Sequence, residues 1–400
     1  MSAAAASTHA RYRGRLEALG AHTDLLRPAL AAAQWPPDGG EQGEWRRLYA
    51  RFHPDRAPFA MLVLTRSGEG RQIVRLDAFE ERPAPRFAHE AVVESGAGWM
   101  RVAAFPSDPA LRSLGALLAR EEEHAVVRYR PYRRCTLRFD GADGVRYAKV
   151  FADRRAERIH AGGVDFWAAA ERGELAFAVP RPYRYERRTR TVWQSSVSGQ
   201  PAWLGLSGPG GMDLARRMGQ ALASLAASRV SPPGVLTAPS LVPRAARLAA
   251  ELVRRVPKLE PDAGRLLGWL HRELAKPRVR PLVPVHGSPH PGQWLYEGLG
   301  VGLVDFDGVA FGHPELDVAS FLAGLEFEDH TRLPAERLGA AFLGGYEAGG
   351  RSLDPQLMSV YRTYRRLAKA LRVACSLRPD GDRRAKLHVE RALAALGEAA

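Results

Sequence analysis

The feature that most constrains the fold is the order of strand-like and helical segments after residue 124. Three strand-like segments at 125–130, 135–139 and 145–151 precede a helical segment at 154–174, and two more strand-like segments lie near 183–186 and 191–196. From residue 212 the pattern is helical, at 212–228, 240–255, 260–276, 315–325, 334–349, 353–377 and 382–397, apart from an irregular stretch at 281–312. This order predicts a mixed α+β chain, with a small β-rich lobe followed by a larger helical lobe.

The first third of the chain mixes both kinds of pattern and carries no motif. A helix is expected over 8–33, strands at 59–65, 72–76 and 99–105, and a helix at 111–123. We therefore divide the 400 residues into an extra α/β region at 1–120, a β-rich lobe at 121–205 and a helical lobe at 206–400, which contains the irregular loop 286–317.

Composition excludes several classes of protein. The net charge is +14, but only five of the 58 basic residues are lysine and asparagine is absent, which is typical of a GC-rich genome. The charge is therefore weak evidence for nucleic-acid binding, which we consider unlikely although basic residues gather at 181–190. Two cysteines, Cys135 and Cys375, cannot build a disulfide framework. No apolar run of ~18 residues or signal-peptide core is present, so we expect a cytoplasmic protein with no membrane segment.

The irregular stretch carries the chemistry. Residues 286–293 read HGSPHPGQ, a strand–turn–strand pattern follows, and residues 301–308 read VGLVDFDG. Kinase chemistry needs a catalytic-loop residue, an amide ligand of Mg²⁺ five residues later, and an aspartate after a short hairpin that holds the metal. Ser288, Gln293 and Asp305 have this spacing. Asp307 is a second metal ligand, a surrogate base or a surface acid, and the sequence leaves these alternatives open.

These motifs resemble the aminoglycoside phosphotransferase and choline kinase-like family, whose catalytic loop is usually written HGDxHxxN. His286, Gly287, His290, Asp305 and Asp317 match the family pattern. The resemblance covers about residues 124–395 and implies a two-lobed protein kinase-like fold, with ATP and Mg²⁺ as cofactors. The first 120 residues look like the N-terminal cap of maltokinase-like members.

Two residues of the loop depart from that pattern. Gln293 replaces asparagine and offers the same amide oxygen on a longer arm. Ser288 replaces the catalytic aspartate, and a hydroxyl cannot act as a base at neutral pH, a role worth about 10²–10⁴-fold in rate. We group Ser288, His286 and Asp307 as the catalytic-loop candidates, and we expect His286 to bond to the backbone or to Asp317.

The nucleotide side is predicted from the third strand and its surroundings. Lys149 lies on that strand, where kinases place the lysine that binds the α/β-phosphates, and lysine is rare in this chain. Its acidic partner is expected to be Glu157 or Glu171, with Glu157 preferred. Arg133 or Arg134, in the turn between the first two strands, is a further phosphate ligand or a solvated hairpin residue. Ser196 lies in the expected linker between the lobes, whose backbone would bind adenine.

Three functions remain open at this point. The first is an ATP/Mg²⁺-dependent phosphotransferase with an unknown small-molecule hydroxyl acceptor. The second is a pseudokinase that binds nucleotide as a scaffold or regulator, as Ser288 suggests. The third is a nucleic-acid or other binding module. Between Asp305 and Glu347 the sequence has nine acidic residues and two arginines. This acidic segment either binds a cationic acceptor or consists of a metal site and solvated helix faces.

Overall fold

The computed structural model describes residues 16, 45–53, 57–66, 72–86, 90–95, 98–120, 124–142, 144–278, 280–326 and 334–397. The helix predicted over 8–33 lies outside these residues except for Leu16. In the described part of the chain, no helix is long and apolar enough to cross a membrane.

The first third of the chain contains an antiparallel sheet. Its spatial order is β1-β2-β3-β5-β4, and a short helix, α3 (Leu114–Leu118), follows it. The predicted strands are present, whereas the helix expected over 111–123 is only five residues long, because the chain must be extended again when the next sheet starts at residue 124. The strands are β1 (Arg46–Phe52), β2 (Ala60–Arg66), β3 (Gln72–Phe79), β4 (Ala91–Ser95) and β5 (Gly98–Ala104).

The second sheet confirms the predicted β-rich lobe. Its order is β6-β7-β8-β10-β9, all antiparallel, with α4 (Arg155–Glu171) inserted after the third strand. The helix packs against β8, β9 and β10, since alanine and aromatic residues alternate with charged ones along it. The strands are β6 (His124–Arg130), β7 (Arg134–Gly141), β8 (Gly144–Phe151), β9 (Pro182–Glu186) and β10 (Thr191–Ser195).

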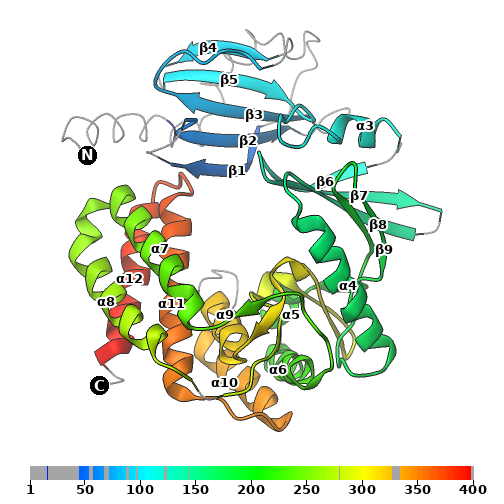
Figure 1. The fold of residues 1–400 in the computed structure, drawn as a ribbon, viewed down its shortest axis with the longest axis vertical. Coiled ribbons are helices and arrows are strands. Elements are labelled where there is room, and N and C mark those ends of the chain that lie inside the picture. Colours follow the sequence, from blue (N-terminus) through cyan, green and yellow to red (C-terminus); the bar gives the residue numbers. More distant parts are fainter. Residues whose placement is uncertain are drawn as a thin grey trace.

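The rest of the chain is mainly helical, as predicted (Figure 1). Two apolar cores fill it, one around α7, α8, α11 and α12 and the other around α6, α9 and α10. The helices are α5 (Ala202–Leu206), α6 (Gly211–Ala227), α7 (Val242–Arg255), α8 (Glu260–Ala275), α9 (Glu315–Leu325), α10 (Ala335–Ala348), α11 (Pro355–Ala374) and α12 (Gly381–Gly397). Short strands and single 3₁₀ turns lie between them: β11 (Gln200–Pro201), β12 (Val235–Leu236), β13 (Val283–Val285), β14 (Trp294–Glu297), β15 (Gly300–Leu303), β16 (Ala310–Gly312), and the turns η2 (Pro239–Leu241), η3 (Pro257–Leu259), η4 (Pro291–Gln293) and η5 (Phe306–Gly308).

The first sheet packs against both other parts of the molecule. Its Val63 and Ile73 share an apolar core with Val126 and Tyr129 of β6. On the other side, the backbone N–H of Phe52 donates to the carbonyl of Cys375, at the end of α11, over 3.0 Å. Figure 1 shows the sheet above the β6 edge and the end of α11. Both cysteines are buried free thiols.

Candidate active site

The irregular stretch of the sequence forms a loop, a hairpin and a second loop. Residues 286–293 follow β13 and end in the turn η4, and the β14–β15 hairpin then leads to Asp305. Asp305 has a φ of 72°, a left-handed conformation that aspartate tolerates better than most residues. The buried ring of Phe306 lies 4.4 Å from that of Phe166 on α4, measured between centroids. This contact joins the loop of the helical part to the helix of the β-rich lobe.

Lys149 connects the second sheet to this loop. It lies on the central strand β8, between Thr136 of β7 and Val192 of β10. Its ammonium group is 2.9 Å from a carboxylate oxygen of Asp305 and 3.0 Å from one of Asp307. Lys149 is buried, so both contacts lie in a region of weak solvent screening.

Arg134 brings a second cation to the same carboxylates. It begins β7, and its two terminal nitrogens are each 3.4 Å from one oxygen of Asp305. It also forms an ion pair with Asp307. Burial opposes ionisation of Asp305, but the charges of Lys149 and Arg134 outweigh this effect and hold its pKa well below the usual range. The carboxylate of Asp305 is therefore ionised at neutral pH.

Gln293 completes the group. Its amide nitrogen donates to Asp305 over 3.2 Å, and among the described residues none bonds to its buried carbonyl oxygen Oε1. A buried amide oxygen without a partner is costly, and it is a suitable ligand for a hard cation. Mg²⁺ typically takes one or two protein oxygens, with phosphates and water supplying the rest. The chemistry of Gln293 and Asp305 thus fits the metal that the sequence predicts, and the described residues hold no cluster of three His, Cys, Asp or Glu for another kind of metal site.

Asp317 braces the loop at 286–293. Its carboxylate accepts the backbone N–H groups of His286 over 2.6 Å and of Gly287 over 2.8 Å. The His286 ring is 3.1 Å from the carbonyl of Val304, so its bonds are structural, as expected from the sequence. Burial lowers the pKa of His286 to about 4, and the imidazole is therefore neutral at pH 7.

Ser288 follows this braced turn directly. Its side chain is half-buried and its carbonyl accepts the N–H of His290 over 2.8 Å. The loop geometry is thus maintained around a residue that cannot take up a proton at neutral pH.

Three predicted nucleotide-side residues lie away from this cluster. Glu157 is exposed on α4, and the ion pairs of Lys149 are with Asp305 and Asp307 instead, so the expected Lys149–Glu157 pair is not formed in this structure. Arg133 is exposed, whereas its neighbour Arg134 enters the site. Ser196 is exposed just after β10, and its N–H donates to the carbonyl of Val145 over 3.1 Å.

Sequence reasoning missed the support of the β6–β7 turn. Tyr132, at the tip of this turn with a φ of 62°, donates its backbone N–H to Asp108 over 2.9 Å. Its hydroxyl donates to Asp77, which lies in the first sheet within a buried ionic network with Arg75 and Arg101. The turn that carries Arg134 is therefore fixed by the first third of the chain. No sequence signal points to this, because the partners are more than twenty residues apart.

The chain is similar to a family of phosphotransferases and to several solved structures. A model of the phosphotransferase enzyme family (APH) matches residues 155–355. Choline kinase LicA from Streptococcus pneumoniae is similar in structure, with 12% identity and a TM-score of 0.50 over 72% of this chain and 97% of that chain. Choline kinase from Cryptosporidium parvum Iowa II gives 11% identity and a TM-score of 0.50 over 69% of this chain and 89% of that chain.

A third solved structure has a higher sequence identity. Aminoglycoside-3'-phosphotransferase of type VIII is 26% identical over 64% of this chain and 97% of that chain, with a TM-score of 0.47. No curated protein sequence matches the chain. The two choline kinases show that the fold is protein kinase-like, and the family match covers half of the chain together with most of the candidate site. The chain therefore belongs to the phosphotransferase enzyme family.

Proposed function

We propose that the chain transfers the γ-phosphate of ATP to a hydroxyl group of a small molecule in a Mg²⁺-dependent reaction. One observation carries this proposal: Lys149, from the second sheet, and Gln293, from the far side of the β14–β15 hairpin, both lie within hydrogen-bonding distance of Asp305. They are a cation for the phosphates and two oxygen ligands for the metal, which is the minimum that phosphoryl transfer requires.

The residues have separate tasks in this proposal. Lys149 and Arg134 bind phosphate oxygens in exchange for their present contacts with Asp305 and Asp307, while Gln293 and Asp305 hold Mg²⁺. Mg²⁺, when bound, neutralises charge on the β- and γ-phosphate oxygens. The acceptor oxygen forms a bond to the γ-phosphorus, the bond to the β–γ bridging oxygen breaks with its electron pair leaving on ADP, and the hydroxyl proton passes to water.

Ser288 favours one alternative, a pseudokinase that binds nucleotide without transferring phosphate. General-base assistance contributes about 10²–10⁴-fold in rate. The transition state of phosphoryl transfer is loose, however, and depends mainly on positioning and on electrostatic stabilisation. The proposal is therefore a slow phosphotransferase, and we expect Ser288→Asp to increase its turnover.

The test is Mg²⁺-dependent release of ADP in the presence of a panel of neutral, cationic and anionic hydroxyl compounds. Wild type should release ADP with at least one acceptor, Asp305→Asn should lose at least 100-fold, and the exposed-site control Asp140→Asn should behave as wild type. Thermal stabilisation by ATP without ADP release from wild type or Ser288→Asp would identify a pseudokinase. Absence of both stabilisation and release would refute nucleotide chemistry altogether.

A further inference from the structure

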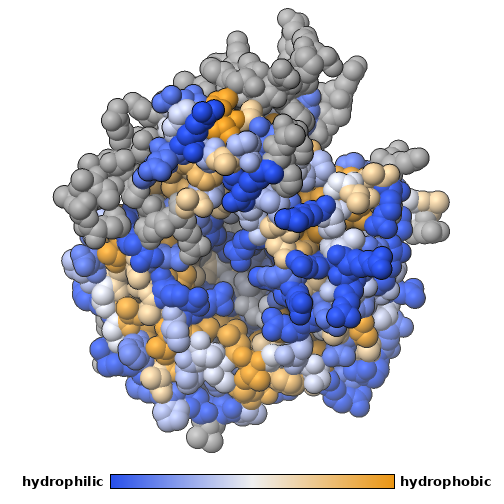
Figure 2. All heavy atoms as spheres, turned by 45° about the horizontal axis from the view of Figure 1, so that its top comes forward, coloured by the Kyte–Doolittle hydropathy of each residue, from blue (hydrophilic) through white to orange (hydrophobic). Residues whose placement is uncertain are grey.

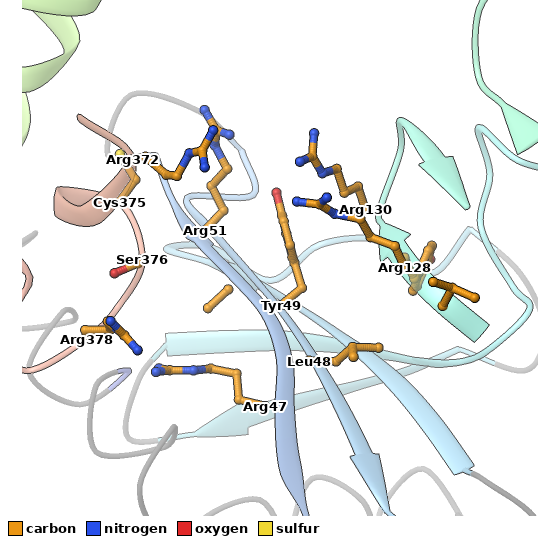
Figure 3. A pocket seen from close by; sticks show the side chains of 13 residues that line it. Arg47, Leu48, Tyr49, Arg51, Arg128, Arg130, Arg372, Cys375, Ser376 and Arg378 are labelled. Atoms are coloured by element: carbon orange, nitrogen blue, oxygen red, sulfur yellow. The ribbon is translucent and has the colours of Figure 1, made fainter. Parts of the chain in front are cut away.

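A hollow of about 780 Å³ lies beside β6, the strand that precedes the β6–β7 turn, and the function proposed above makes no use of it. Its walls come from β1, from β6, and from the end of α11 with the segment after it. Figure 3 shows the guanidinium groups of Arg51 and Arg372 on one side of the Tyr49 hydroxyl and those of Arg128 and Arg130 on the other. We call this hollow the arginine pocket.

The charge of the arginine pocket has one sign. Six arginines line it, and none of the described lining residues is acidic; these arginines are Arg47, Arg51, Arg128, Arg130, Arg372 and Arg378. Burial, followed by the nearby charges of Arg128, Arg134 and Arg372, lowers the pKa of Arg130 to about 9. Figure 2 shows hydrophilic side chains gathered beside a hollow on the face turned toward the viewer. Like charges held this close repel one another, and a bound anion would relieve that repulsion.

The arginine pocket adjoins the reacting centre. Arg128 and Arg130 lie on β6, which leads through the Tyr132 turn to Arg134. Both are close enough to Asp305 for its carboxylate to raise their pKa values, partly offsetting the effects that lower them. Arg130 is also the cross-strand partner of Arg134, which contacts Asp305, so the pocket and the proposed nucleotide site share the β6–β7 strand pair.

The lining residues all lie outside residues 155–355, the segment that matches the family model. One wall is β1, which belongs to the first third of the chain. The pocket is thus built from parts of this chain that the shared phosphotransferase segment does not include, as expected for a feature that selects a particular substrate.

The acidic segment gives no support to a cationic acceptor. The carboxylate of Glu326 is held by Arg362 and Arg366, and that of Glu315 is buried against Arg280. Together with the contacts of Asp305, Asp307 and Asp317 described above, these pairs occupy most of the described acids between 305 and 347.

We propose that the arginine pocket binds the anionic part of the acceptor, a small hydroxyl compound that carries phosphate. The reaction in this inference rests on the proposed function, whereas the binding of the anion in the pocket does not. Arginine suits phosphate because its planar guanidinium donates two parallel hydrogen bonds. The acceptor hydroxyl then attacks the γ-phosphorus while its phosphate stays bound in the pocket, and ADP leaves.

Calorimetric titration of inorganic pyrophosphate into the full chain tests the binding. Arg130→Gln combined with Arg372→Gln should weaken the dissociation constant at least tenfold, and lysine at both positions should restore part of the affinity. The matched control Arg337→Gln, on the exposed face of α10, should bind as wild type.

Two results would refute anion binding in the arginine pocket. One is unchanged or absent pyrophosphate binding in wild type and the double glutamine variant alike. The other is a loss of binding in Lys149→Met but not in the double variant, which would assign the anion to the nucleotide site.

Steady-state ADP release separates this proposal from the function on which it rests. Phosphate-bearing acceptors such as glycerol 3-phosphate and glucose 6-phosphate should support turnover, whereas glycerol, glucose and kanamycin should not. The double glutamine variant should raise KM for the anionic acceptor at least tenfold with little change in kcat. Pyrophosphate binding in the pocket without any turnover would refute the phosphotransferase and leave the anion site standing, while turnover with neutral acceptors alone would refute the acceptor assignment.

Discussion

Replacing Asp108 with alanine tests whether the first third of the chain holds the β6–β7 turn in place. Asp108 is 2% exposed and lies between β5 and α3. Its carboxylate accepts the hydroxyl of Tyr129 over 2.8 Å and the backbone N–H groups of Tyr132 and Ala110, both over 2.9 Å. Leu111 N–H also reaches it, but this group keeps the Asp108 carbonyl as an acceptor at 3.1 Å.

The expected cost follows from these bonds. Three donors lose a charged acceptor, and each such bond contributes about 1.5–3 kcal/mol. Water can enter and satisfy part of the loss, so the free energy of unfolding should fall by about 3–5 kcal/mol. Asp108→Asn keeps an acceptor oxygen and should lose about half as much. Because the turn also carries Arg134, nucleotide affinity should fall in the same variants.

Urea unfolding of the full chain, followed by circular dichroism, measures the effect. The control is Asp140→Ala, which removes an ion pair with Arg138 at two half-exposed side chains and should cost less than about 1 kcal/mol. An Asp108→Ala midpoint that coincides with that of the control would refute the claim that the first third of the chain fixes the turn.

Three further predictions concern the candidate active site. The pKa of His286 is about 4 in the folded chain and about 6.5 in the unfolded chain, so about 3 kcal/mol of stability is present above pH 6.5 and is lost as the pH falls through 4. His286→Gln should therefore reduce the dependence of the unfolding free energy on pH between 6.5 and 4. Equal pH dependence in this variant and in wild type would contradict the low pKa of His286. Gly287 has a φ of +88°, and a side chain at this position would meet the carbonyl of Gly308. Gly287→Ala should therefore lower the free energy of unfolding by about 2–3 kcal/mol. An unchanged melting temperature would be inconsistent with this strain. Lys149→Met leaves Asp305 with one cation fewer, so the variant should be less stable than wild type in the absence of Mg²⁺. Addition of Mg²⁺ should then raise the melting temperature of the variant more than that of wild type. Equal increases in the two proteins would argue against a metal at Asp305.

Much of the fold could be predicted because its signals are local. The alternation in β6 to β10 and the helical periods after residue 211 lie within single elements, and the structure has them close to the predicted bounds. The strands β1 and β4 were missed. β1 reads RRLYARF, where charged residues interrupt the apolar alternation, and β4 is only five residues long. Both are defined by pairing with neighbouring strands rather than by their own composition.

The candidate site could likewise be predicted only where its signals are local. Lys149, Gln293 and Asp305 could be singled out because their residue types and spacing are local properties, and the structure brings them together. The partner of Lys149 could not be predicted, because it depends on how two lobes meet. The arginine pocket left no trace in the sequence, since arginine is so frequent in this chain that six converging ones do not form a pattern. The predicted domain boundaries and the cap-like role of the first 120 residues stay predictions.

The most direct test of the central claim is calorimetric titration of ATP with and without Mg²⁺ into wild type and Asp305→Asn. If Lys149, Gln293 and Asp305 form a metal–nucleotide site, wild type should bind ATP at least tenfold more tightly with Mg²⁺, and Asp305→Asn should lose this dependence. ATP binding that is equal with and without Mg²⁺, or equal in both proteins, would contradict the account.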